Sequence, residues 1–368
     1  MATQAHFQAG GGYDVAIVGA GPAGATLARI IGEGCKVLLI DRRPMAADPP
    51  SPGQADKCCG GLLAPDGQKM LARQGLGLPR DVLVGPQLFV VRTLDLRTRR
   101  ERYYQRHYIN LDRGKLDRWL VSLVPARVDA RFGCRLRSFE RREEGFTLIL
   151  SCGGKEYREQ ARLLVGADGA ASRVRRLAFP DTPWPKRYAA IQEWFACPQA
   201  LPYFCAIFDP GVTDFYAWTI PKEEGLLLGA ALEPVAGAAE RFERLKARLA
   251  EFGFRFDRRL RRHGGLLLRP TRVGQICTGG AGIALIGEAA GWISPSSAEG
   301  ISYAFRSAIA LADAVQARPG DVLSAYRRNT ASLRLNILAK NLKSPFMYNS
   351  VLRDLVLRSG VGSMEVRR

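Results

Sequence analysis

The sequence contains few of the residues that bind metal ions. Only three of its 368 residues are histidine, and its eight cysteines include no pair with Cys-x-x-Cys spacing. Zinc sites are built from such ligands at such spacings, so we expect no metal centre. The cysteines also lack the regular framework of a small secreted domain, which predicts a reducing environment and mostly free thiols.

Long apolar segments are missing as well. No uninterrupted apolar run approaches the roughly 18 residues that indicate a transmembrane helix. The first twelve residues are polar and glycine-rich rather than a charged segment followed by an apolar one. We therefore expect a cytoplasmic protein with neither a membrane span nor a secretory signal.

Acidic residues are scarce relative to basic ones. The 54 Lys and Arg residues exceed the 35 Asp and Glu residues, which gives a formal net charge of +19. A field of this sign favours anionic partners, although only ten of the bases are lysine and such an arginine bias also arises from coding composition. The bases are spread along the chain without a zinc-finger, RNP or zipper signature, so we expect no nucleic-acid partner.

The strongest motif lies near the start of the chain. Residues 13–18 predict a short buried strand, residues 25–31 a helix, and residues 35–40 a second strand. A Gly-x-Gly-x-x-Gly turn occupies positions 19–24, and Asp41 follows the second strand. In such a β-α-β unit the glycines let a pyrophosphate approach the helix N-terminus, and the acid accepts hydrogen bonds from a ribose. The sequence therefore predicts a dinucleotide site.

Two later segments also place a small-residue turn after an apolar strand. Residues 162–167 lead into Asp168-Gly169 and a basic helix start, and residues 282–286 lead into Gly287-Glu288-Ala289. Either segment alone fits an ordinary strand and turn. Together with the first unit they resemble the glutathione-reductase-type FAD fold of aromatic hydroxylases, halogenases and geranylgeranyl reductases. The resemblance covers about residues 13–325 and implies FAD as the cofactor.

This resemblance assigns roles to individual positions. It implies that Asp168-Gly169 lies near the pyrophosphate and that Gly287-Glu288 binds the ribityl chain, with Glu288 standing where the family has Asp. Residues 113–120 resemble a helix whose Arg113 faces the cofactor, and a plain surface helix is the alternative. The residues expected to bind the cofactor are Gly19, Gly21, Pro22, Ala23, Gly24, Asp41, Arg42, Cys59, Gly60, Gly61, Arg113, Asp168, Gly169, Gly287, Glu288, Ala289, Pro295, Gly300 and Ile301.

Two further motifs resemble those of the geranylgeranyl reductase family, and most closely its bacterial CbrA-like branch. Residues 57–61, Lys-Cys-Cys-Gly-Gly, are similar to a stretch that lies beside the flavin in that family. Residues 216–221, Tyr-Ala-Trp-Thr-Ile-Pro, are similar to a motif whose aromatic rings line an isoprenoid tunnel. Ile220 replaces Phe, and Ala231 replaces the last Gly of the same motif.

The resemblance implies that Cys59, Tyr216 and Trp218 are the catalytic residues. Adjacent cysteines cannot both face a flavin, and Cys59 directly precedes the two glycines. A buried small side chain is the alternative for the cysteine, and an ordinary sheet core is the alternative for the aromatic pair.

The fold class expected from these patterns is α/β. A Rossmann FAD-binding domain would comprise residues 1–85, 106–180 and 270–325. Residues 86–105 and 181–269 would form an antiparallel-sheet substrate domain, with a helix at 238–252.

The C-terminal tail, residues 326–368, is expected to be helical and basic. From Arg327 onward it carries nine bases and two acids, interleaved with apolar residues. This composition fits peripheral contact with an acidic membrane surface, on its cytoplasmic face, or a pair of helices that cap the domain.

Taken together, these motifs predict an FAD-dependent reductase of carbon–carbon double bonds in an isoprenoid lipid. Hydride would come from reduced flavin and a proton from water or Cys59. The sequence holds no second Gly-x-Gly-x-x-Gly unit, so electrons would come from transiently docked NADPH, a ferredoxin or a quinol. A monooxygenase or halogenase on the same fold is one alternative, and a non-catalytic polyprenyl-binding flavoprotein is another.

Overall fold

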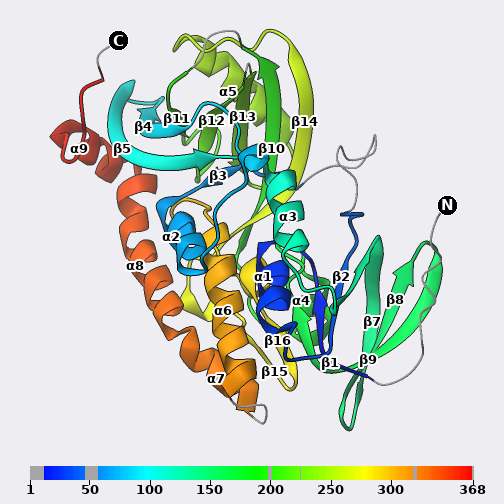
Figure 1. Cartoon of the computed structure of the whole chain (residues 1–368). Helices are drawn as coiled ribbons and strands as arrows, with labels where there is room; N and C mark the ends of the chain where they lie inside the picture. Colours follow the sequence, from blue (N-terminus) through cyan, green and yellow to red (C-terminus); the bar gives the residue numbers. More distant parts are fainter. Residues whose placement is uncertain (1–11, 46–56, 198–200, 224, 318–320, 367–368) are drawn as a thin grey trace.

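The structure is a computed structural model that describes residues 12–45, 57–197, 201–223, 225–317 and 321–366 (Figure 1). Within these ranges the strands form two sheets of eight. The first sheet has the order β15-β16-β9-β1-β2-β6, and β8 joins β9 and β7 at its side. Its strands are β1 (Tyr13–Val18), β2 (Val37–Asp41), β6 (Asp129–Phe132), β7 (Cys134–Arg142), β8 (Gly145–Cys152), β9 (Lys155–Gly166), β15 (Gly279–Gly280) and β16 (Ile283–Leu285).

The centre of the first sheet is parallel and buried on both faces. β1 pairs in parallel with β2 and β9, in the registers Val15↔Val37 and Val15↔Leu163. Helices α1 (Pro22–Ile31) and α6 (Ile301–Ala317) pack on one face, where Val15 and Ile17 are buried. Alternate residues such as Ala16 lie in a separate core on the other face. Burial on both faces explains why these strands read as nearly continuous apolar runs.

The second sheet has the order β14-β10-β13-β12-β11-β4-β5-β3. Most of its neighbours are antiparallel, as expected, but β11 pairs with β4 in parallel. Antiparallel neighbours that follow each other in the chain are joined by tight turns. β4 and β11 are far apart in the sequence, and the long connection between them permits either direction. The strands are β3 (Leu62–Leu63), β4 (Leu88–Asp95), β5 (Arg100–Asn110), β10 (Lys186–Ala196), β11 (Phe204–Phe208), β12 (Ala217–Lys222), β13 (Gly225–Leu232) and β14 (Arg259–Arg269).

Helix α5 (Ala238–Ala250) covers one face of the second sheet and occupies the segment expected at 238–252. Phe242, Leu245 and Leu249 are buried there at helical spacing. The opposite face carries an aromatic cluster that includes Trp218. The remaining helices are α2 (Pro65–Arg73), α3 (Arg113–Ser122), α4 (Arg173–Ala178), α7 (Val322–Asn329), α8 (Ala331–Tyr348) and α9 (Ser350–Ser359), with short 3-10 turns at Arg80–Val82, Val273–Gln275 and Gly287–Ala290.

One cysteine pair departs from the expectation of free thiols. Cys134 on β7 and Cys152 on β8 face each other across the hairpin and form a disulfide. The other cysteines are not disulfide-bonded. Among the described residues, no helix has the length and apolar character needed to cross a membrane.

The C-terminal helices are attached to the second sheet through a buried ion pair. Arg353 on α9 donates from Nε to Oδ2 of Asp95 at 2.7 Å, and neither side chain is more than 4% exposed. Arg353 also donates to the carbonyl of Met347. Asp95 caps the turn after β4 by accepting from the amides of Arg97 and Thr98. This pair therefore links the last helix to a turn more than 250 residues earlier.

We expect Arg353→Met to lower the free energy of unfolding by about 3 kcal/mol, because it leaves the buried Asp95 carboxylate without its charge partner. Arg358→Met on the same helix is the matched control, since Arg358 is 61% exposed and paired at the surface. Its cost should stay below about 1 kcal/mol. Urea unfolding followed by circular dichroism measures both, and equal costs would contradict the assignment of the buried pair.

Candidate functional site

The turn between β1 and α1 has the geometry of a phosphate cradle. Gly19 has a φ of 108°, and a Cβ on Gly24 would lie 1.8 Å from the Gly19 carbonyl oxygen, so neither position accepts a side chain. Gly21, in contrast, faces open space, with no heavy atom within 4 Å of its Cβ position. Helix α1 begins at Pro22 without a side-chain cap, which leaves first-turn N–H groups for an anion. Ala23 is buried behind the turn.

Asp41, at the end of β2, holds this turn in place. Its Oδ2 accepts from the amide of Ala20 at 2.8 Å, and its Oδ1 accepts from the amide of Arg43 at 2.8 Å. The Arg43 guanidinium pairs with the same carboxylate at 3.0 Å. Arg42, the expected cofactor contact, is exposed. Two consecutive arginines follow the acid, and the sequence alone did not single out Arg43 as the one that turns inward.

Arg43 begins a chain of buried ion pairs that ends at a cysteine. Its Nη1 donates to Asp117 at 2.8 Å, and Asp117 accepts from Nε of Arg113 at 2.8 Å. Arg113 then reaches Sγ of Cys59 with its Nη1, at 3.7 Å. Burial alone would raise the pKa of Asp117, but the two guanidinium groups more than offset this and hold it below its usual range. The dinucleotide turn and the Cys59 loop are thus connected electrostatically.

Asp168 and Gly169 follow β9, next to the first turn. A Cβ on Gly19 would lie 2.5 Å from the carbonyl oxygen of Ala167, so the two segments are in contact. Asp168 accepts from the Ser172 hydroxyl and from the amide of Arg173, which caps α4. Burial raises the pKa of Asp168. The carboxylate is thus committed to positioning its own loop, while Gly169 has a φ of 76° and open space beside it.

The third expected segment also lies against the first turn. A Cβ on Gly287 would lie 3.0 Å from Cβ of Ala23, and the Gly287 amide donates to Ser307 on α6. Glu288 accepts from Lys57 Nζ at 3.3 Å and from the amide of Leu268 at 3.4 Å. The acid that replaces the family's Asp therefore meets the residue preceding the two cysteines. Ala289 is buried beneath it.

Residues 295–301 complete this side of the site by leading into α6. The carbonyl of Pro295 accepts from Nε of Arg269 at 3.1 Å. Glu299 caps the helix by accepting from the Ser302 amide at 2.7 Å and from its hydroxyl at 2.6 Å. Gly300 and Ile301 stand at the helix start.

The Cys-Cys-Gly-Gly loop, residues 58–61, packs on the second sheet. Cys58 lies over β14, where a Cβ on Gly265 would be 2.9 Å from the Cys58 Cβ, and burial raises the pKa of this thiol to about 12. Cys59 instead contacts Arg113 and accepts from the Gly61 amide at 3.4 Å. A Cβ on Gly60 would lie 2.6 Å from Cδ1 of Ile220. The two thiols therefore have different environments.

Tyr216 and Trp218 are brought together beside this loop. Their ring centres are 5.3 Å apart, and the Trp218 ring lies over Gly229, where a Cβ would come within 2.3 Å of it. The Tyr216 hydroxyl donates to the carbonyl of Ser297 at 2.7 Å. Tyr348, the last residue of α8, donates in the same way to the carbonyl of Ser296 at 2.7 Å. An aromatic surface therefore lies between the second sheet and the segment that precedes α6.

Lys222 is a site residue that the sequence reading missed. Its Nζ donates to the carbonyls of Gly61 and Leu111 at 3.1 and 3.0 Å and to the side-chain oxygen of Asn110. Asn110 is itself held by the carbonyl of Pro221 at 2.8 Å. Burial lowers the pKa of Lys222 to about 7. Its position directly after the Tyr-x-Trp-x-Ile-Pro motif was the available signal.

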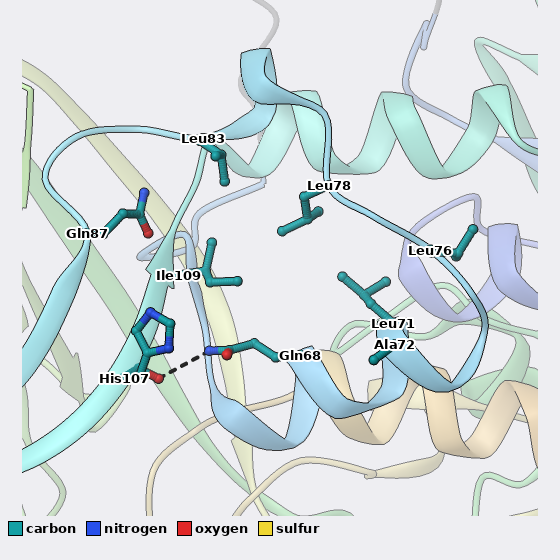
Figure 2. Close-up of a pocket in the computed structure, with 9 residues that line it drawn as sticks. All are labelled: Gln68, Leu71, Ala72, Leu76, Leu78, Leu83, Gln87, His107 and Ile109. Carbon is teal, nitrogen blue, oxygen red and sulfur yellow. Dashed lines mark hydrogen bonds between the residues drawn. The ribbon is translucent and has the colours of Figure 1, made fainter.

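A hollow of about 340 Å³ lies apart from this site, between α2 and β5 (Figure 2). Its lining is largely aliphatic, with Leu71, Leu78 and Ile109 exposed to it. Ile109 and Asn110 are neighbours on β5, so their side chains point to opposite faces. The hollow therefore lies on the far side of β5 from Lys222.

The three turns fit a dinucleotide such as FAD. Gly21 and Gly169 leave open space beside the backbone, and the N-terminus of α1 follows Gly21. Asp41 belongs to the first turn and Glu288 to the third. The first turn and Asp41 would hold the adenosine and pyrophosphate part, and Gly287-Glu288 the ribityl part.

Comparison with known proteins identifies the family. Protein CbrA of Escherichia coli is 40% identical over 349 residues, which cover 95% of this chain and 94% of that protein. Protein CbrA of Shigella sonnei is also 40% identical, over 95% of this chain and 97% of its own length. The chain belongs to the CbrA family. No family model matches it.

Several solved structures share this fold. A geranylgeranyl bacteriochlorophyll reductase-like protein from Thermoplasma acidophilum aligns with a TM-score of 0.77 and 20% identity, over 94% of this chain and 90% of that one. PqsL from Pseudomonas aeruginosa, in complex with 2-aminobenzoylacetate, aligns with a TM-score of 0.70 and 19% identity over 95% and 100%. A flavin-dependent brominase, Bmp2, gives 0.69 and 18% over 95% and 94%. These likenesses confirm the expected α/β fold.

The buried Lys222 predicts a pH dependence of stability. Its pKa is about 7 in the folded protein and close to the ordinary 10.5 in the unfolded chain, so the unfolded chain binds more protons between these values. Raising the pH through this window therefore favours the folded state. We expect the free energy of unfolding of the wild type to rise, relative to Lys222→Met, as the pH increases from 7 to 10. Urea titrations at several pH values measure the difference, and Lys155→Met, at an exposed lysine, should run parallel to the wild type.

Proposed function

We propose that the protein is an FAD-dependent oxidoreductase that reduces carbon–carbon double bonds of an isoprenoid lipid. The observation that carries this proposal is the packing of the Cys-Cys-Gly-Gly loop on β12, the aromatic strand, with Gly60 against Ile220 and Trp218. Two motifs that resemble the geranylgeranyl reductase family, and that lie far apart in the sequence, thereby form one surface. The geranylgeranyl bacteriochlorophyll reductase-like neighbour supports the same assignment.

The aromatic surface suits an apolar substrate. Trp218 is 6% exposed and packs with Tyr216, Phe215 and Phe208 in one cluster. The hydroxyls of Tyr216 and Tyr348 donate to backbone carbonyls, and their rings pack against this cluster. Such a surface would bind a hydrocarbon chain by dispersion and exclude water from the reacting bond.

The residues around this surface limit the choice of proton donor. Burial raises the pKa of Tyr216 far above its usual value, and its proton is already donated to Ser297. Cys59, which contacts Arg113, is the residue we propose to carry the transferable proton. Bound FAD would supply a hydride for one alkene carbon, and Cys59 or water would supply the proton for the other. An external donor supplies the two electrons that balance the reaction: one NADPH, one quinol or two reduced ferredoxins.

The first test follows the visible spectrum of the protein after reconstitution with FAD and anaerobic reduction. We expect the oxidised flavin band to return when a geranylgeranyl lipid is added and to remain bleached with buffer or a saturated phytanyl lipid. Return of the band only with oxygen, together with oxygenated or halogenated product, would instead support the monooxygenase or halogenase alternative. A flavin band whose return does not depend on the lipid, with or without oxygen, would support the non-catalytic polyprenyl-binding alternative.

The adjacent cysteines provide a matched pair of variants. We expect Cys59→Ser to slow lipid-dependent reoxidation by roughly 100-fold, the range for loss of a positioned proton donor. Cys58→Ser should stay within about twofold of wild type, because Cys58 packs on Gly265 away from Arg113. Stopped-flow absorbance gives both rates, and FAD affinity measured by fluorescence serves as a check on folding. Equal rates for the two variants would remove Cys59 from the mechanism.

A further inference from the structure

Helix α8 is apolar on two sides, which the packing of the domain does not require. Leu333 and Ile337 are buried in the core beneath the first sheet. On the other side Leu335, Leu338 and Leu342 are 66%, 46% and 69% exposed. Phe346 continues this stripe at 53% exposed. The spacings of three, four and four residues place all of these exposed side chains on one helical face.

The next helix also exposes apolar side chains. On α9, Val351 and Leu355 are 60% and 57% exposed. Figure 1 shows α8 along one side of the molecule with α9 at its end, in orange and red. We call this surface the α8–α9 apolar face and define it by Leu335, Leu338, Leu342, Phe346, Val351 and Leu355. Exposed apolar side chains gathered on two successive helices are typical of an interaction site.

Charge favours an anionic occupant. The whole chain has a net charge of +19, and the segment from Arg327 onward has nine bases and two acids. One of these bases, Arg353, is buried against Asp95 and does not contribute to the surface. One of the acids, Asp354, is already paired with Arg100 and Arg358, both at 2.8 Å. Lys343 is exposed at the border of the stripe. A second copy of the chain would bring two such basic surfaces together, whereas anionic lipid headgroups would neutralise them.

The position of the face favours a lipid for a second reason. The exposed Phe346 is followed directly by Met347 and Tyr348, which belong to the aromatic cluster of the candidate site. Tyr348 lies 5.0 Å from Phe215 between ring centres. The apolar face outside and the aromatic surface inside therefore meet at the end of one helix. If the proposed function holds, a bilayer docked here would lie next to the end of α8 that contacts the site.

We propose that the α8–α9 apolar face docks on an anionic lipid bilayer. The two helices would lie in the interfacial region, with their leucines and Phe346 among the acyl chains and the basic residues at the headgroups. Amphipathic helices with this division of apolar and basic residues bind at such a depth without spanning the membrane.

Flotation with vesicles tests the proposal. The probe is a phosphatidylcholine vesicle with roughly a third phosphatidylglycerol, compared with pure phosphatidylcholine at low salt. We expect the full-length protein to float with the anionic vesicles and Leu342→Glu/Phe346→Glu to bind at least tenfold more weakly. Val235→Glu/Leu260→Glu is the matched control, since these residues are also apolar and exposed, at 59% and 53%, but lie elsewhere. It should bind like the wild type.

Several outcomes would overturn the proposal. The first is that the wild type does not bind anionic vesicles, and the second is that both double variants lose vesicle binding equally. The third is that light scattering shows a wild-type dimer that only Leu342→Glu/Phe346→Glu dissociates. The last outcome would assign the face to contact between copies. Thermal melting confirms that each variant is folded. Because flotation needs neither flavin nor isoprenoid substrate, its failure is distinguishable from failure of the proposed reductase activity.

Discussion

The site depends on the chain of buried ion pairs that runs from Asp41 through Arg43 and Asp117 to Arg113 and Cys59. Each charge in it is matched, which is necessary because an unpaired charge at these buried positions would cost several kcal/mol. The chain connects the end of β2, the start of α3 and the Cys-Cys-Gly-Gly loop. Displacement of any member would therefore disturb both the dinucleotide turn and the thiol.

Two further anchors hold the same loop. Lys222 on β12 joins Gly61 to Asn110 at the end of β5. Lys57, the residue before the loop, pairs with Glu288 in the turn that follows β16. The loop is thus bonded to the second sheet and, through the residue before it, to the turn that follows β16. This arrangement explains how a short segment without regular secondary structure keeps Cys59 and Gly60 at fixed positions next to the aromatic strand.

The sequence was sufficient for the parts that depend on local patterns. The first β-α-β unit, the glycine turns and helix α5 follow from spacing alone, because each is determined by neighbours in the chain. The features that the sequence did not predict depend on contacts between residues far apart in the chain. The inward turn of Arg43 requires Asp117, the burial of Lys222 requires Gly61 and Leu111, and the Cys134–Cys152 disulfide requires the hairpin register. The parallel pairing of β11 with β4 likewise reflects a crossover that no local pattern encodes.

The distribution of polar groups around the aromatic surface favours recognition by shape. The hydroxyls of Tyr216 and Tyr348 donate to backbone carbonyls. Lys222 donates to an oxygen acceptor and Arg113 to a sulfur acceptor. In the same cluster the indole N–H of Trp194 has no hydrogen-bond partner and is a directional group left for a ligand. A site of this kind distinguishes ligands by the length and bend of a hydrocarbon chain, where each methylene contributes about 0.8 kcal/mol. It would bind the long chain of an isoprenoid more strongly than a small aromatic acid. If the proposed function holds, this preference would distinguish the chain from PqsL, whose structure is in complex with 2-aminobenzoylacetate.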